Sequence, residues 1–158
     1  MKNALLFLLF FLFTFTACKK KNDAPQTQTL QLQNDGFTTG GAKAFQAGFV
    51  VGETAEVTLG PVSNTFQVTA VQFLFGGTGA IPTSRDIVLK IYKDIGVGTP
   101  GTLLYTSTYS VAASDNLLQQ IDLRDKLIVV NGGGSIRVAI EMTAAGLPSV
   151  AVDKDGTV

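Results

Sequence analysis

Apolar and polar residues alternate along much of the chain after Phe37, and this alternation predicts β-strands. In one segment the apolar set is Ile136, Val138, Ile140 and Met142, and the residues between them are Ser135, Arg137, Ala139 and Glu141. Successive side chains of a strand point to opposite faces, so we expect the first set to face a core and the second to face solvent. The segment 87–92 repeats the pattern, with Ile87, Leu89 and Ile91 on one face and Val88, Lys90 and Tyr92 on the other.

Three other segments predict strands by composition. Thr65–Phe75 is long, β-branched and aromatic, so we expect one strand at the centre of a sheet. The segments Leu103–Val111 and Leu118–Leu123 are also rich in β-forming residues. No window keeps the i, i+3, i+4, i+7 spacing of a helix over three turns.

Glycine and proline residues, which favour turns, separate these segments at short intervals. This spacing is typical of an all-β sandwich or barrel. Pro100-Gly101 predicts a type II turn between two strands, because proline fixes φ and glycine permits positive φ. Gly76-Gly77-Thr78-Gly79 and Gly132-Gly133-Gly134 lack the Gly-Lys-Ser/Thr of a phosphate loop and are interpreted as strand connections. About 120 residues are enough to bury a two-sheet core.

The first residues follow a different pattern. After Lys2, Ala4–Ala17 is a run of 14 uncharged, mostly apolar residues. A transmembrane helix needs about 20 such residues, so the run fits the apolar region of a secretory signal better than an uncut anchor.

Phe15-Thr16-Ala17-Cys18 resembles the lipobox of bacterial lipoproteins, although Phe15 replaces the usual Leu. The resemblance implies cleavage between Ala17 and Cys18 and acylation of Cys18, with palmitate among the expected chains. In that family an Asp after the Cys marks retention in the inner membrane. Lys19 stands there instead, which favours the outer membrane, with the body on either its periplasmic or its outer face. The following Lys19-Lys20-Lys21 can attract anionic headgroups, and the CKKKND opening looks like lipoproteins of Bacteroidota-type bacteria.

We therefore divide the chain into a signal peptide (1–17), a lipidated cysteine with a flexible tether (18–34) and a β-sandwich domain (35–158). The tether is rich in Gln and Thr and poor in apolar residues. Leu30 and Leu32 alternate with Gln, so a first edge strand could begin there.

The segment Ile87–Met142 is similar to a β-sandwich module of secreted bacterial proteins. The similarity lies in a strand ending Ile91-Tyr92, the sequence Pro100-Gly101-Thr102, and a strand ending Ile121-Asp122-Leu123. It implies an antiparallel, jelly-roll-like sandwich of accessory, adhesive or carbohydrate-binding type. Such modules usually continue by a strand or two beyond the equivalent of residues 148–153. We therefore expect that the C-terminus is naturally shortened or that the reading frame is incomplete, and that a sheet edge is left open near Ser135–Met142 and Ser149–Val152.

Composition excludes several classes of chemistry. The chain has no His and one Cys, which excludes His-based triads, imidazole metal sites, intrachain disulfides and multi-cysteine clusters. The formal net charge is zero, and from Leu30 onward 8 basic and 11 acidic residues leave about −3. A mildly acidic body is not expected to bind nucleic acid.

Few residues remain as candidate sites. Asp153 and Asp155, followed by Gly156, resemble the start of a calcium loop but lack its later ligands, so we favour a hairpin turn. Asp94 is expected to be a turn residue. The pairs Glu53/Glu56 and Asp122/Asp125 are interpreted as surface charge, and Tyr92, Tyr105 and Tyr109 as core or rim residues that could also stack on sugars.

These observations predict a lipid-anchored envelope protein that is not an enzyme and binds a glycan or protein ligand through its β domain. The alternative is a surface fibre or adhesin subunit that assembles through an open sheet edge.

Overall fold

The computed structural model describes residues 27–33, 43–77, 84–96 and 99–153. The chain divides into two units, Met1–Gln31 and Leu32–Val158. The strands are β1 (Lys43–Phe45), β2 (Thr54–Val62), β3 (Phe66–Val68), β4 (Ala70–Gly76), β5 (Ser84–Asp94), β6 (Pro100–Ala112), β7 (Leu118–Asp122), β8 (Ile128–Val130), β9 (Gly134–Met142) and β10 (Ser149–Asp153). A single 3-10 turn, η1, spans Arg124–Lys126.

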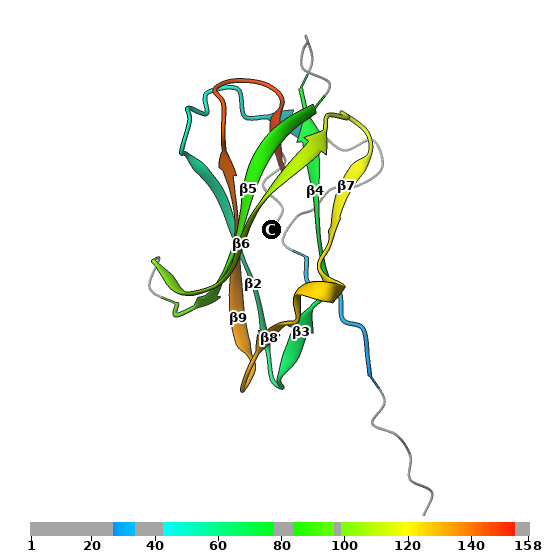
Figure 1. The fold of residues 1–158 in the computed structure, drawn as a ribbon, viewed down its shortest axis with the longest axis vertical. Coiled ribbons are helices and arrows are strands. Elements are labelled where there is room, and N and C mark those ends of the chain that lie inside the picture. The colour runs from blue at the N-terminus through cyan, green and yellow to red at the C-terminus, as the bar shows by residue number, and fades with distance from the viewer. Residues whose placement is uncertain (1–26, 34–42, 78–83, 97–98, 154–158) are drawn as a thin grey trace, which may run out of the picture. The chain divides into compact units, whose positions relative to one another are not determined.

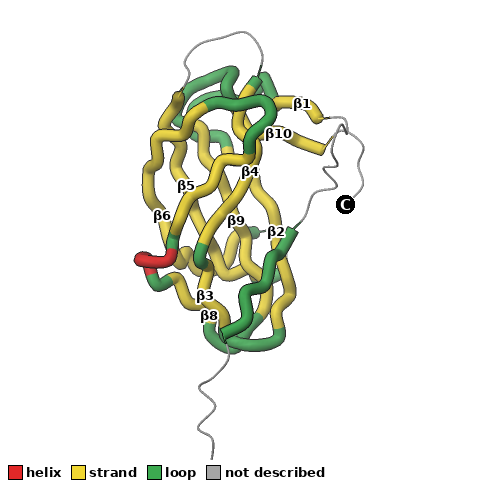
Figure 2. The backbone as a smooth tube through the Cα atoms, turned by 90° about the vertical axis from the view of Figure 1, so that its right-hand side faces the viewer, coloured by secondary structure: helices red, strands yellow, loops and turns green. Residues whose placement is uncertain are grey.

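All the strand pairs are antiparallel. One four-stranded sheet has the order β1-β10-β4-β7 and the other the order β2-β9-β5-β6, while β3 and β8 form a separate pair. Figures 1 and 2 show the strands of the second sheet running together, with β4 and β7 in a different layer. Leaving β3 and β8 aside, every connection except that between β5 and β6 crosses to the other sheet, and the strand order is that of a jelly roll. The predicted all-β, antiparallel fold class is confirmed.

The alternating segments form the core as predicted. Ile87, Leu89 and Ile91 of β5 are fully buried, and Ile136, Val138 and Ile140 of β9 are 3–6% exposed. Both sheets contribute to one hydrophobic cluster, which also holds Phe75 of β4 and Ile121 of β7. Ala139 is the exception, because it is fully buried although it lies on the outer face of β9.

The predicted single strand over Thr65–Phe75 is wrong. The segment breaks at Thr69 into β3 and β4, because the Thr69 carbonyl accepts a hydrogen bond from the Leu123 amide at 2.8 Å. β3 then pairs with β8, whereas β4 lies between β10 and β7. Only the second half of the segment therefore has the internal position expected for all of it.

The predicted turn at Pro100-Gly101 is also wrong, since both residues begin β6 and Pro100 pairs with Asp94. A Cβ on Gly101 would lie 2.1 Å from the Lys93 carbonyl oxygen. Glycine is needed here for close strand approach rather than for a turn.

The open edge expected near the C-terminus does not exist. β9 lies between β2 and β5, and β10 lies between β1 and β4. Lys43–Phe45 pairs with Ala151–Asp153 and so covers the strand that was expected to be exposed. The segment 27–33, with Leu30 64% exposed, contains no strand.

Arg85 forms hydrogen bonds with the loop that joins β9 to β10. Its two terminal guanidinium nitrogens lie 2.8–3.3 Å from the carbonyl oxygens of residues 144–148. Arg85 lies on the same face of β5 as Ile87, so its side chain joins the end of the core to this loop. Within the described ranges, no helix has the length and apolar character needed to span a membrane.

Candidate functional site

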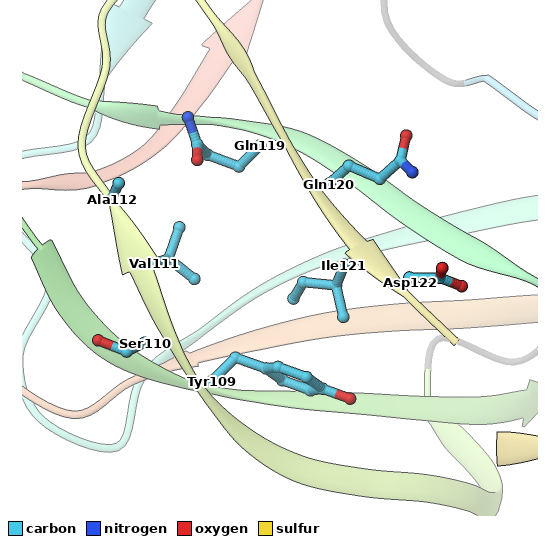
Figure 3. A pocket seen from close by; sticks show the side chains of 8 residues that line it. All are labelled: Tyr109, Ser110, Val111, Ala112, Gln119, Gln120, Ile121 and Asp122. Carbon is cyan, nitrogen blue, oxygen red and sulfur yellow. The ribbon is translucent and has the colours of Figure 1, made fainter. Parts of the chain in front are cut away.

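A surface groove with a volume of about 370 Å³ lies between β6 and β7. These strands are edges of different sheets, so each has one side that no strand of its own sheet pairs with. Its lining comes from four consecutive residues of each strand, 109–112 and 119–122. Figure 3 shows Val111, Ile121 and the Tyr109 ring lying between the two strands.

Strand alternation gives the groove its chemical character. Val111 and Ile121 are 5% and 7% exposed and form an apolar floor. Their neighbours Ser110, Gln120 and Asp122 are exposed and supply hydroxyl, amide and carboxylate groups. An apolar floor with a few polar groups is the usual composition of a binding site.

The crossover from β6 to β7 is held against β4. The Ser114 amide donates to the Phe75 carbonyl at 2.7 Å, and the Gly77 amide donates to Asp115 Oδ1 at 2.7 Å. A Cβ on Gly76 would lie 2.5 Å from that carboxylate oxygen, so only glycine allows the close approach. These contacts position β7 beside β6.

Two tyrosines of β6 share a hydrogen bond at one end of the groove. The hydroxyl oxygens of Tyr105 and Tyr109 are 2.6 Å apart, and both rings pack against the core. Burial, followed by the hydrogen bond to Tyr105, raises the pKa of Tyr109 to about 12. The expectation that these tyrosines are core or rim residues is confirmed.

This pKa predicts a loss of stability at alkaline pH. An unfolded Tyr109 ionises near pH 10, whereas the folded residue stays neutral until about pH 12. Its contribution to stability is therefore complete below pH 10 and is lost as the pH rises toward 12. Ultraviolet titration should show a late tyrosinate step that Tyr109→Phe removes and Tyr92→Phe leaves in place. A late step that survives Tyr109→Phe would contradict the assignment.

The rim beside β7 holds two exposed polar pairs. Gln72 donates to Gln120 at 2.7 Å, and Arg124 donates to both carboxylate oxygens of Asp122. The hydrogen bonds from Arg124 lower the pKa of Asp122 to about 2. Asp125 pairs with Lys126, so the predicted pair Asp122/Asp125 consists of two carboxylates with separate basic partners.

The outer face of the second sheet carries a charge cluster that is largely buried. Arg137 donates to Asp94 at 2.9 Å and to Glu56 at 3.1 Å, and the side chains of Arg137 and Asp94 are only 12% and 7% exposed. Asp94 also accepts the Gly96 amide, as a turn residue does. Glu53 instead accepts the amide of Val50 at 2.8 Å, so the Glu53/Glu56 pair serves two different structural roles.

The other predicted site residues fall at or beyond the limits of the described structure. Ala17, Cys18 and Asp155 lie outside the described residues. Asp153 is the last residue of β10 and pairs with Lys43 in register. Among the residues that can be described, no three His, Cys, Asp or Glu side chains gather as metal ligands would.

Sequence reasoning missed the groove because it forms between strands of different sheets. One signal was present: no charged residue occurs from Gly96 to Ser114, an unusual length for a surface strand and its flanks. No family model, curated protein or solved structure matches the chain.

Proposed function

We propose that the chain is a lipid-anchored cell-envelope protein whose β domain is a non-catalytic module that binds a glycan or a protein. The observation that carries the proposal is the apolar run Ala4–Ala17, which ends at the only cysteine of the chain. A lone cysteine at the end of a signal segment has its sulfur at the membrane interface, where lipid transfer takes place. Several acyl chains on one residue anchor a protein far more firmly than a single chain does.

The charged side chains support a binding role rather than a catalytic one. Asp94 and Glu56 are bound to Arg137, Glu141 to Lys90, and Asp122 to Arg124. A general acid or base needs access to a substrate proton and a tuned pKa. Carboxylates that are held in ion pairs stabilise the fold and are not free to transfer a proton to a substrate. We therefore assign ligand binding to the groove between β6 and β7.

Mass spectrometry of the mature N-terminus tests the anchor. We expect a first residue of Cys18 that carries acyl chains, and partition of the protein into a detergent phase. Cys18→Ser should abolish both the acylation and the cleavage after Ala17, because the enzymes involved require the thiol. An intact Met1, or a cleavage far from Cys18, would refute this part of the proposal.

A screen of oligosaccharides and extended peptides tests the binding surface. Ser110→Arg places a long side chain at the rim of the groove and should weaken a bound ligand about tenfold or more. Thr58→Arg is the matched control, because Thr58 is an exposed residue of β2, an edge strand at the other end of the same sheet. Equal effects of the two substitutions would place the ligand elsewhere.

The alternative, a subunit that assembles through a sheet edge, is supported by a specific observation. β6 is a long edge strand, although it is not at the C-terminal position predicted from sequence. Detergent-solubilised protein that forms a ladder of oligomers would favour this alternative over a ligand-binding monomer.

A further inference from the structure

Four strands form the edges of the two large sheets, and three of them carry features that discourage further pairing. β1 has three residues. β2 contains Glu56 and Pro61 and a register shift between Leu59 and Val62. β7 has five residues and ends at Asp122. Short length, charge, proline and bulges are the means by which proteins protect sheet edges.

β6 lacks most of this protection. It has 13 residues, no charged side chain and no proline after its first position. Its pairing with β5 shifts register on both sides of Leu103, and from Tyr105 to Ala112 the pairing is continuous. Within the described ranges, no backbone hydrogen bond outside the sheet pairings involves residues 100–112. No other described strand pairs with the outward-facing amides and carbonyls of β6, and such groups can accept an incoming strand.

The sequence of this edge is self-complementary. Tyr105-Thr106-Ser107-Thr108-Tyr109 reads the same in both directions about Ser107. If two copies pair antiparallel about a two-fold axis at Ser107, each Tyr105 faces the other copy's Tyr109 and each Thr106 faces Thr108. Aromatic pairs and Thr–Thr pairs are among the favourable cross-strand combinations, and no like charges meet.

The two faces of β6 suit this arrangement. Thr106 and Thr108 are exposed on the outer face, whereas Tyr105, Ser107 and Tyr109 are half-buried on the face toward the groove. Pairing in this register would extend the second sheet across both molecules.

We propose that β6 is a homodimerisation edge, at which two copies of this chain pair antiparallel about Ser107. The contact is isologous, since each copy offers the same strand, and it therefore closes as a dimer instead of growing into a fibre. It goes beyond the proposed function and does not depend on the lipid anchor. An interface of one strand pair is small, so confinement of both copies to one membrane would strengthen it.

Cysteine cross-linking of the full-length chain in detergent tests the register. In a Cys18→Ser background, Ser107→Cys carries the only thiol of the chain. On the two-fold axis the two Ser107 Cα atoms would lie about 4.5–5.5 Å apart, within disulfide range. We expect mild oxidation to yield a covalent dimer on a non-reducing gel. Thr58→Cys on the protected edge β2 should stay monomeric, and equal cross-linking at both positions would overturn the proposal.

Charged substitutions at two positions of β6 distinguish pairing in the predicted register from non-specific association. Added to Ser107→Cys, the exposed substitutions Thr106→Lys and Thr108→Lys together set lysine opposite lysine twice. They should slow cross-linking about tenfold or more. Thr106→Glu with Thr108→Lys sets glutamate opposite lysine and should restore the rate. Equal rates in the two pairs, no cross-link from a Ser107→Cys protein with an unchanged melting temperature, or ladders beyond the dimer would each refute the proposal.

Discussion

Val138→Asp is expected to unfold the domain. Val138 is 5% exposed at the centre of β9, where it pairs with Val57 on one side and Ile91 on the other. The substitution forfeits about 1.5–3 kcal/mol of apolar burial. It also buries a carboxylate without a partner, which costs several kcal/mol more. The combined loss is comparable with the whole stability of a typical domain, about 5–15 kcal/mol.

Circular dichroism and thermal melting check this result. Val138→Ala should retain the fold with a loss of about 2 kcal/mol, because it removes volume without adding charge. Thr58→Asp introduces the same carboxylate at an exposed position of the adjacent strand, opposite Arg137, and should have little effect. An unchanged melting temperature for Val138→Asp would show that the core assignment is wrong.

Arg137→Ala is expected to be the most damaging substitution on the outer face. The Asp94 carboxylate, 7% exposed, would lose its guanidinium partner, and Glu56 would lose one as well. Removing one partner of a partly buried ion pair costs more than removing one partner of an exposed pair, because the remaining charge has less contact with water. Denaturant titration should show the loss as a lower midpoint.

Lys90 provides a matched control in the same sheet. It binds Glu141 at 2.5 Å, but both side chains are about one-quarter exposed. Lys90→Ala should therefore cost about 0.5 kcal/mol, as exposed ion pairs do. Adding Asp94→Asn to Arg137→Ala removes the unpaired charge and should recover part of the loss. If Arg137→Ala and Lys90→Ala lower the free energy of unfolding equally, burial does not determine how much the ion pairs of Arg137 contribute to stability.

Burial on the outer face also accounts for Ala139, which sequence reasoning placed in solvent. Ala139 lies in register with Lys90 on one neighbouring strand and Glu56 on the other. Each of these long side chains is engaged in an ion pair across strands. Amphipathic side chains cover apolar surface with their stems, so a small residue among them loses its contact with water. Alternation predicts which face a residue occupies, whereas the neighbours decide how far it is covered.

Features that depend on near neighbours along the chain could be predicted from the amino-acid sequence. The alternation in 87–92 and 135–142 predicted which side chains form the core, because the side-chain period of a strand is local and strict. The same local pattern predicted an all-β chain and the strand over Leu118–Leu123, of which Leu118–Asp122 is β7. The apolar run that ends at Cys18 is a local signal of the same kind, and it alone supports the proposed anchor.

The identity of neighbouring strands, in contrast, is known only from the folded structure. The break at Thr69 depends on Leu123, the Asp94 carboxylate finds Arg137 43 residues away, and β10 is covered by a strand from the start of the domain. Strand pairing joins segments that are distant along the chain, and period-two patterns are alike in every strand, so the pattern contains no record of the partner. For that reason the open edge was predicted at the C-terminus, whereas the jelly-roll order places the long uncharged edge at β6.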